Sequence, residues 1–207
     1  MAPQVARKLV DPRAPNDPSV ESAFAAVPET MTAEILDGEL HTQPRPAMRH
    51  TKVAWELGME LGPPFARGRG GPGGWIFRAE PELHFGPKPD KIVPDLAGWR
   101  VERGIENIGV DEDPAYYEAV PDWICEIVSP RTEATDRVKK MHLYRRERVA
   151  HVWLIQPRAH ILEVYRFEVD HYGLVETFAG DRVVRAEPFD AVEISLRHLW
   201  IGDPETT

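Results

Sequence analysis

Cysteine is nearly absent from this chain of 207 residues, since Cys125 is the only one. A single cysteine excludes an internal disulfide framework and a zinc site built from several cysteines. No apolar run approaches the roughly 18 to 20 residues that cross a bilayer. The first residues also lack the apolar stretch of a secretory signal. We therefore expect a cytoplasmic protein without a membrane partner.

Positive charge is also scarce, because 25 Lys and Arg stand against 34 Asp and Glu, which gives a formal net charge of −9. Such an acidic chain argues against a protein that coats nucleic acid by electrostatic attraction alone. It does not exclude an enzyme that meets a phosphodiester at a carboxylate site through a metal ion. The hydrophobic share of 42% predicts an ordinary globular core, and the length suits one domain.

Proline and periodicity divide the chain into three parts. Residues 1–30 carry five prolines and no sustained hydrophobic period, which predicts an irregular N-terminal extension. Residues 31–201 are expected to form the domain, and residues 202–207 a C-terminal tail.

The hydrophobic pattern predicts three helices, over 31–36, 50–61 and 132–148. The second has an apolar stripe from His50 to Leu61 at helical spacing and is expected to end at Gly62-Pro63-Pro64. Strands are expected over 39–42, 75–78, 81–85, 92–99, 123–128, 151–156, 161–168, 174–178 and 192–196. This order of elements predicts an α/β or α+β domain with a mixed β-sheet.

A glycine-rich segment at 66–74 contains a formal G-x-G-x-x-G match. No apolar strand precedes it, and Pro72 disfavours a helix start within it. We interpret it as a loop and not as a dinucleotide site.

Two carboxylates stand where a sheet should be apolar, Asp95 and Glu126. The period of two places Glu126 on one strand face with Ile124 and Val128. A carboxylate buried among apolar neighbours is unfavourable unless it is paired, hydrogen-bonded or bound to a metal. Glu126 therefore requires a partner.

One helical stripe could supply that partner, because Asp136, Lys140 and Tyr144 recur every four residues. One interpretation is a structural ion pair between Glu126 and Lys140, with Asp95 capping a turn. The other is that both carboxylates bind a hard divalent cation, which takes oxygen ligands, while a lysine orients or deprotonates an attacking water. The second arrangement suits phosphodiester hydrolysis, and the residues alone leave both open.

Three segments carry a resemblance to a known family: Val-Pro-Asp-Leu-Ala (93–97), Pro-Asp-Trp-Ile-Cys-Glu-Ile-Val-Ser-Pro (121–130) and Asp-Arg-Val-Lys-Lys-Met-His-Leu-Tyr (136–144). Their order and spacing resemble the bacterial putative restriction-endonuclease family, a branch of the PD-(D/E)XK nuclease superfamily. The resemblance covers roughly residues 31–200. It implies a mixed β-sheet core flanked by helices and a Mg²⁺-dependent DNA endonuclease, with Mn²⁺ as a substitute ion.

The resemblance also implies roles for individual residues. Asp95 and Glu126 match the two metal-binding acids. In our own hypothesis the backbone carbonyl of Ile127 helps them to hold the ion. The usual lysine two residues after the second acid is replaced by Val128. In this family the lysine comes from the next helix, where the matching position is Lys140, which would position the attacking water.

Three further residues are candidates for the same site. Superfamily members often add a carboxylate, which makes Glu34 and Glu82 candidates against their interpretation as surface acids. His50 lies on an apolar helical stripe, where a hydrogen-bonded core histidine competes with a catalytic one. Asp122 also follows a proline, and we interpret it as a turn-capping residue.

A rival hypothesis is a catalytically inactive nuclease fold kept as a dimeric interaction module. The net charge of −9 favours it, because a free-standing DNA enzyme usually presents a basic groove. Basic residues group near the glycine-rich loop and along the helix at 137–148, where they either follow a phosphate backbone or form a solvated face. A homodimer would match the two strands of a duplex. The choice between DNA and RNA stays open.

Overall fold

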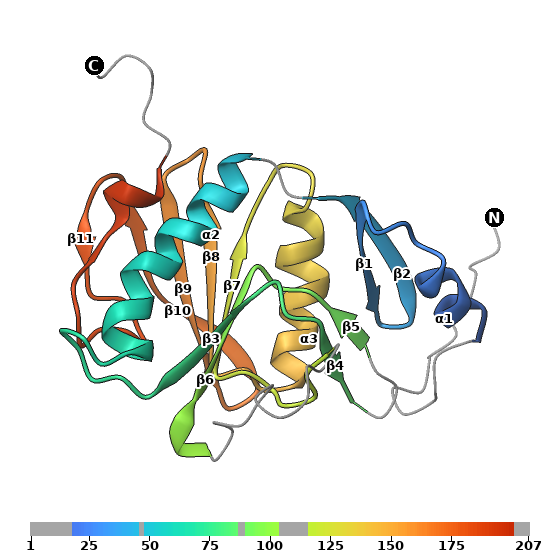
Figure 1. Cartoon of the computed structure of the whole chain (residues 1–207), viewed down its shortest axis with the longest axis horizontal. Coiled ribbons are helices and arrows are strands. Elements are labelled where there is room, and N and C mark those ends of the chain that lie inside the picture. Colours follow the sequence, from blue (N-terminus) through green and yellow to red (C-terminus); the bar gives the residue numbers. More distant parts are fainter. Residues whose placement is uncertain (1–17, 46–47, 87–89, 104–115, 201–207) are drawn as a thin grey trace, which may run out of the picture.

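The computed structural model of the chain describes residues 18–45, 48–86, 90–103 and 116–200 (Figure 1). Its central feature is a six-stranded sheet. In spatial order its strands are β10 (His171–Ala179), β9 (Ile161–Glu168), β8 (His151–Gln156), β7 (Trp123–Ile127), β6 (Leu96–Arg100) and β3 (Trp75–Ala79). Strands β7 and β8 run parallel and the other neighbouring pairs run antiparallel. The predicted mixed sheet is confirmed.

A second, four-stranded sheet lies beside the first and has the order β2-β1-β5-β4. Its strands are β1 (Met31–Leu36), β2 (Glu39–Pro44), β4 (Leu83–Phe85) and β5 (Asp90–Ile92). Helix α1 (Pro18–Ala25) packs against β1 and β2. A short pair, β11 (Val183–Val184) and β12 (Ile194–Ser195), completes the strands of the described chain.

Two predictions for the N-terminal region are wrong. Residues 31–36 form strand β1 and not a helix, because Asp37 and Gly38 both have positive φ and join β1 to β2 in a tight hairpin. A two-residue turn of this kind fixes antiparallel pairing and overrides local helix propensity. The predicted irregular extension contains α1, while residues 1–17 and the predicted tail at 202–207 lie outside the described residues.

The predicted strand over 92–99 is also wrong, since it is two strands in two sheets. Residues 90–92 belong to β5 and residues 96–100 to β6, and the chain crosses between the sheets at Val93-Pro94-Asp95. Proline has no N–H for a β-ladder and is excluded from the middle of a central strand. This crossing leaves Asp95 between the two sheets.

Helices cover both faces of the large sheet. Helix α2 (Met48–Leu61), extended by a π-helical turn at Gly62–Ala66 beyond the predicted end, packs on the face of Trp123, Cys125 and Ile127. The π-helical turn Thr135–Lys140 and helix α3 (Met141–Arg146) lie over the opposite face, between the two sheets (Figure 1). The predicted separation of the two faces of β7 is confirmed.

The remaining predicted elements match the observed ones closely. The strands over 151–156 and 161–168 are found with the predicted ends, and those over 39–42, 75–78, 123–128 and 174–178 with shifted ends. Those over 81–85 and 192–196 are shorter than predicted, and residues 67–74 form an irregular loop. No helix in the described ranges has both the length and the apolar character that a membrane crossing requires.

Candidate active site

Asp95 is held at the junction of the two sheets by groups far away in the sequence. Its Oδ2 accepts a hydrogen bond of 2.6 Å from the backbone N–H of Ile127 on β7. Its Oδ1 pairs with Nε2 of His50 on α2. The Asp95 side chain is 13% exposed, so it remains accessible at one edge. Asp95 thus links β7 to α2 instead of only capping the turn after Pro94.

Glu126 is the centre of a buried charge cluster with Lys140. The Lys140 Nζ lies 3.2 Å from Glu126 Oε1, 3.0 Å from Glu34 Oε1 and 3.7 Å from Asp136 Oδ1. It also donates to the backbone carbonyl of Val93 at 3.4 Å. Glu34, Glu126, Asp136 and Lys140 are each at most 3% exposed. The predicted ion pair therefore exists, and it belongs to a larger cluster.

The hydroxyl of Tyr144 completes the contacts of Glu126 by donating to Oε1. Burial, together with the neighbouring Glu126, raises the pKa of Tyr144 well above its ordinary value, so the hydroxyl keeps its proton. Tyr144 and Lys140 lie four residues apart, so both contact Glu126 from one side of the helical segment. The predicted stripe of Asp136, Lys140 and Tyr144 is confirmed.

The cluster holds more acid than its lysine neutralises. Burial raises the pKa of Glu126 well above its usual range, and the attraction of Lys140 only partly opposes this. Burial likewise raises the pKa of Asp136. Although burial alone would lower the pKa of Lys140, its three carboxylate neighbours raise it well above the ordinary value. Lys140 therefore stays charged, and additional positive charge would stabilise the ionised carboxylates.

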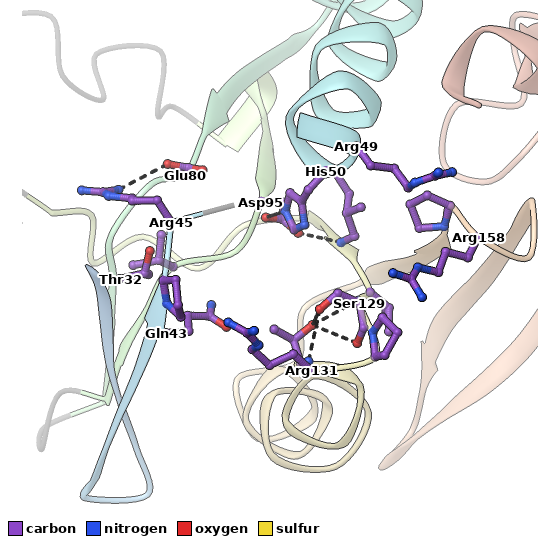
Figure 2. A pocket seen from close by; sticks show the side chains of 17 residues that line it. Thr32, Gln43, Arg45, Arg49, His50, Glu80, Asp95, Ser129, Arg131 and Arg158 are labelled. Atoms are coloured by element: carbon purple, nitrogen blue, oxygen red, sulfur yellow. Dashed lines mark hydrogen bonds and ion pairs between the residues drawn. The ribbon is translucent and has the colours of Figure 1, made fainter. Parts of the chain in front are cut away.

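A cavity of about 410 Å³ opens beside this cluster (Figure 2). Val93, Asp95 and Ile127 form part of its wall. The Val93 carbonyl accepts from Lys140, Ile127 directly follows Glu126, and Asp95 accepts a hydrogen bond from Ile127. The cavity therefore gives access to the Asp95 side of the cluster. Glu126 and Lys140 lie behind this wall.

Four arginines also line the cavity, and sequence analysis missed all of them: Arg45, Arg49, Arg131 and Arg158. Arg131 and Arg158 each follow a proline shortly after the ends of β7 and β8. These strands are parallel, with Ile127 opposite Ile155, so their carboxyl ends deliver both arginines to one edge of the sheet. The repeated Pro-Arg after two apolar strands was the available signal.

Basic residues along the helix at 137–148 have partners other than a nucleic acid. Arg137 pairs with Glu163 at 2.7 Å, and Arg146 pairs with Asp90 at 2.7 Å. Lys139 pairs with Glu39 at 2.9 Å and therefore points away from Glu126. The helix at 137–148 is therefore largely an ion-paired surface and not a free basic groove.

The other residues considered for the site differ in where the structure places them. Glu34 joins the Lys140 cluster, whereas Glu82 pairs with His84 at 2.7 Å and has no contact with Lys140. His50 lines the cavity, and although burial would lower its pKa, the hydrogen bond to Asp95 raises it above the ordinary value. Asp122 accepts a 2.8 Å hydrogen bond from the backbone N–H of Arg100, in a structural role.

The residues fit a hard divalent cation in ligand type and in charge. Carboxylate oxygens are the preferred ligands of Mg²⁺, and the buried excess of acid is the charge that such an ion would balance. Within the described part of the chain, no three His, Cys, Asp or Glu side chains are gathered as a metal site requires. The Asp95 and Glu126 carboxylates are instead occupied by hydrogen bonds and ion pairs.

Residues 22–197 match the model of the family described as putative restriction endonuclease (Uma2). The chain belongs to this family. The predicted resemblance over residues 31–200 is thereby confirmed, and the match begins nine residues earlier. The motifs quoted above, around Asp95, Glu126 and Lys140, fall within the matched region of this Uma2 protein.

The chain is also similar to a solved structure, a putative nuclease belonging to DUF820 from Anabaena variabilis. The TM-score is 0.64, with 22% sequence identity over 86% of this chain and 96% of that chain. The likeness shows that the Uma2 protein shares the fold of that structure. A comparison with curated proteins gave no match.

Proposed function

We propose that this protein is a Mg²⁺-dependent endonuclease that hydrolyses phosphodiester bonds in DNA. The supporting observation is a buried cluster with an excess of carboxylates beside an arginine-lined cavity, whose wall includes Asp95 and Ile127, the residue that follows Glu126. A phosphodiester is an anion and needs positive charge to approach such a cluster. The arginines supply that charge at the cavity, although the whole chain is acidic.

Asp95 and Glu126 would hold the ion, with Mn²⁺ as a substitute. When bound, Mg²⁺ would polarise the phosphodiester and lower the pKa of a bound water. The Ile127 N–H and His50 orient the Asp95 carboxylate, and Tyr144 orients that of Glu126. Both carboxylates must give up part of these contacts to bind the ion. This exchange is easier for Asp95, because its side chain lines the cavity and is partly exposed.

Lys140 would position the attacking water. Its three carboxylate neighbours keep it charged, so it can donate hydrogen bonds but cannot remove a proton. In the present arrangement Lys140 Nζ has acceptors on Glu34, Glu126, Asp136 and Val93. A water must therefore replace one of these contacts, and the weakest by distance is Asp136 at 3.7 Å.

Plasmid nicking with Mg²⁺ or Mn²⁺ tests the proposal. We expect Asp95→Asn and Glu126→Gln to lower cleavage at least about 100-fold, because each removes a charged ligand of the ion. Both substitutions keep side-chain size, so circular dichroism should show an unchanged fold. Asp122→Asn and Glu82→Gln are matched controls, since they change the same residue types outside the cluster. Unchanged cleavage in Asp95→Asn or Glu126→Gln contradicts the mechanism.

The alternative is a catalytically inactive, dimeric interaction module. The observation in its favour is that Lys140 and Tyr144 already provide the Glu126 and Glu34 carboxylates with hydrogen bonds and ion pairs. Calorimetric titration of Mg²⁺ and Mn²⁺ into the wild type separates the two functions. Binding that disappears in Glu126→Gln supports the nuclease, whereas absent binding together with absent nicking supports the module. The homodimer itself remains a prediction.

A further inference from the structure

Three arginines at the cavity are available to a ligand. Arg49, Arg131 and Arg158 are exposed, and within the described chain their side chains have no hydrogen bond or ion pair. Arg45 differs, because it donates to the Glu29 carbonyl and lies 3.7 Å from Glu80. Figure 2 shows Arg131 across the cavity from Arg49 and Arg158. Three unpaired guanidinium groups around one cavity favour an anionic ligand with several acceptor oxygens.

A second cavity, of about 480 Å³, adjoins the first and is lined by residues of helix α2. The two cavities share His50, Glu80 and Asp95 in their walls. The second one is largely apolar, and its lining includes Trp55, which is 69% exposed. Met59, another lining residue, is 56% exposed. An exposed aromatic surface of this kind is typical of a binding site.

We propose that the two cavities form one site for a single-stranded segment of nucleic acid. Arg49, Arg131 and Arg158 bind its phosphates, and Trp55 stacks on one of its bases. The inference deepens the proposed nuclease function by naming the form of the substrate, and it rests on that function for the class of ligand.

The residues shared by the two cavity walls indicate the path of the bound nucleic acid. A chain that runs from the arginines to Trp55 passes the three residues common to both cavities, one of which is Asp95. A phosphodiester is thereby brought to the carboxylate that we assign to the metal. The spacing of charge and aromatic surface matches the way that proteins hold single strands, with a basic groove for the backbone and aromatic rings for the bases.

Stacking on Trp55 requires an unpaired base. In a duplex both faces of each base are covered by neighbouring pairs, so only an unstacked or single-stranded nucleotide can place a base on the indole. The apolar neighbours Ala54 and Phe77 in the same cavity suit a base and do not suit a phosphate. The apolar cavity therefore favours a single strand over intact duplex.

Binding is tested on the full chain with fluorescence anisotropy in EDTA, so that no cleavage occurs. The probes are a labelled oligo(dT) and a duplex, each of about 12 nucleotides per strand, which suits the site size of single-strand binders. For Arg49→Gln/Arg131→Gln/Arg158→Gln we expect the slope of log affinity against log salt to become shallower by about 2 for the single strand. Arg69→Gln/Arg182→Gln/Arg197→Gln removes the same charge from exposed arginines outside both cavities and should keep the slope.

Trp55→Ala should weaken oligo(dT) binding about 5- to 100-fold with an unchanged salt slope. Met48→Ala, on the same helix, 83% exposed and outside both cavities, should have no effect. Tighter binding of the duplex than of oligo(dT) would overturn the inference, as would equal losses in the two arginine triple variants. Unchanged oligo(dT) binding by Trp55→Ala, with conversion of a dimer to a monomer in light scattering, would assign the apolar cavity to a second copy instead.

The outcomes also separate this inference from the proposed function. Oligonucleotide binding with the expected variant effects, but no cleavage of either plasmid or labelled oligo(dT) with any divalent ion, would leave this inference standing and remove the nuclease. Nicking that depends on Asp95 and Glu126, but not on the three arginines or Trp55, would retain the nuclease and overturn this inference.

Discussion

At the scale of single residues, the Lys140 ammonium lies within 4 Å of three buried carboxylates, those of Glu34, Glu126 and Asp136. Charges removed from water are stable only with close partners, and loss of one partner leaves an uncompensated buried charge. The cluster is already short of positive charge, since burial raises the pKa of Glu126 even beside Lys140. Stability should therefore depend strongly on this one cation.

We expect Lys140→Met to lower the free energy of unfolding by about 3–5 kcal/mol near neutral pH. Without Lys140 the folded-state pKa values of Glu126 and Asp136 rise further above their ordinary values. An acid with a raised folded-state pKa favours folding more as the pH falls through that value. The difference in free energy of unfolding between the wild type and Lys140→Met should therefore become smaller as the pH falls from about 8 to about 5.5, as measured by urea denaturation.

Lys139→Met is the matched control, because Lys139 is adjacent in sequence but pairs with Glu39, whose side chain is 70% exposed. Exposed ion pairs contribute little to stability, so this variant should change the free energy of unfolding by less than about 1 kcal/mol at either pH. Equal effects of the two substitutions would show that the buried cluster does not depend on Lys140.

At the scale of secondary structure elements, α3 is attached to β7 by both packing and one polar contact. Leu143 and Tyr144 are buried against the large sheet, in the core cluster that contains Ile124, Val152 and Leu154. The Tyr144 hydroxyl then reaches Glu126 on β7. The helix thus both fills the core and fixes the orientation of a candidate metal ligand.

Tyr144→Phe keeps the packing and removes this hydrogen bond. We expect a loss of about 1–3 kcal/mol in the free energy of unfolding, because a buried carboxylate oxygen loses its donor. Groups that hydrogen-bond to a metal ligand orient it and raise metal affinity. Loss of the Tyr144 hydroxyl should therefore lower the Mg²⁺ affinity measured by calorimetry about 10- to 100-fold.

Tyr116→Phe serves as the control, since Tyr116 is 42% exposed and its ring stacks on His84. It should leave both stability and metal affinity unchanged. Full Mg²⁺ affinity in Tyr144→Phe would indicate that Glu126 needs no orientation from α3.

At the scale of the whole molecule, the charge cluster joins the two sheets. Glu34 comes from β1 in the small sheet, Glu126 comes from β7 in the large sheet, and Lys140 comes from the helical segment between them. Strand β1 and the crossing segment are further joined where the backbone N–H of Val93 donates to Glu34 at 2.9 Å. An ion bound near Asp95 and Glu126 would therefore act on the contact between the sheets.

We expect Mg²⁺ to stabilise the folded protein, because a ligand that binds the native state alone shifts the unfolding equilibrium. At 100 times the dissociation constant the gain is about 2.7 kcal/mol, visible as a higher Tm in a thermal scan. Glu126→Gln should lose this gain, and NaCl at equal ionic strength should not reproduce it in the wild type. An equal rise of Tm in Glu126→Gln would place the ion elsewhere.

The sequence by itself determined the pattern of buried faces and the polar residues that interrupt it. The period of two placed Glu126 opposite the face of Trp123 and Cys125, and helical spacing aligned Lys140 with Tyr144, because these are properties of a local backbone. The motif order was sufficient to predict the family, which the match over residues 22–197 confirmed. The same local reasoning failed at 31–36, where the Asp37-Gly38 turn forms a hairpin, and at 92–99, where Pro94 divides the strand.

Only the tertiary structure decided which distant residues meet. It brought Glu34 to Lys140 and left Glu82 with His84, although the two acids were equivalent candidates. It also gathered Arg49, Arg131 and Arg158 around one cavity, because the ends of the parallel strands β7 and β8 and the start of α2 lie together. Spacing along a chain fixes neighbours within one element, whereas contacts between elements depend on strand order and on the direction in which each strand runs.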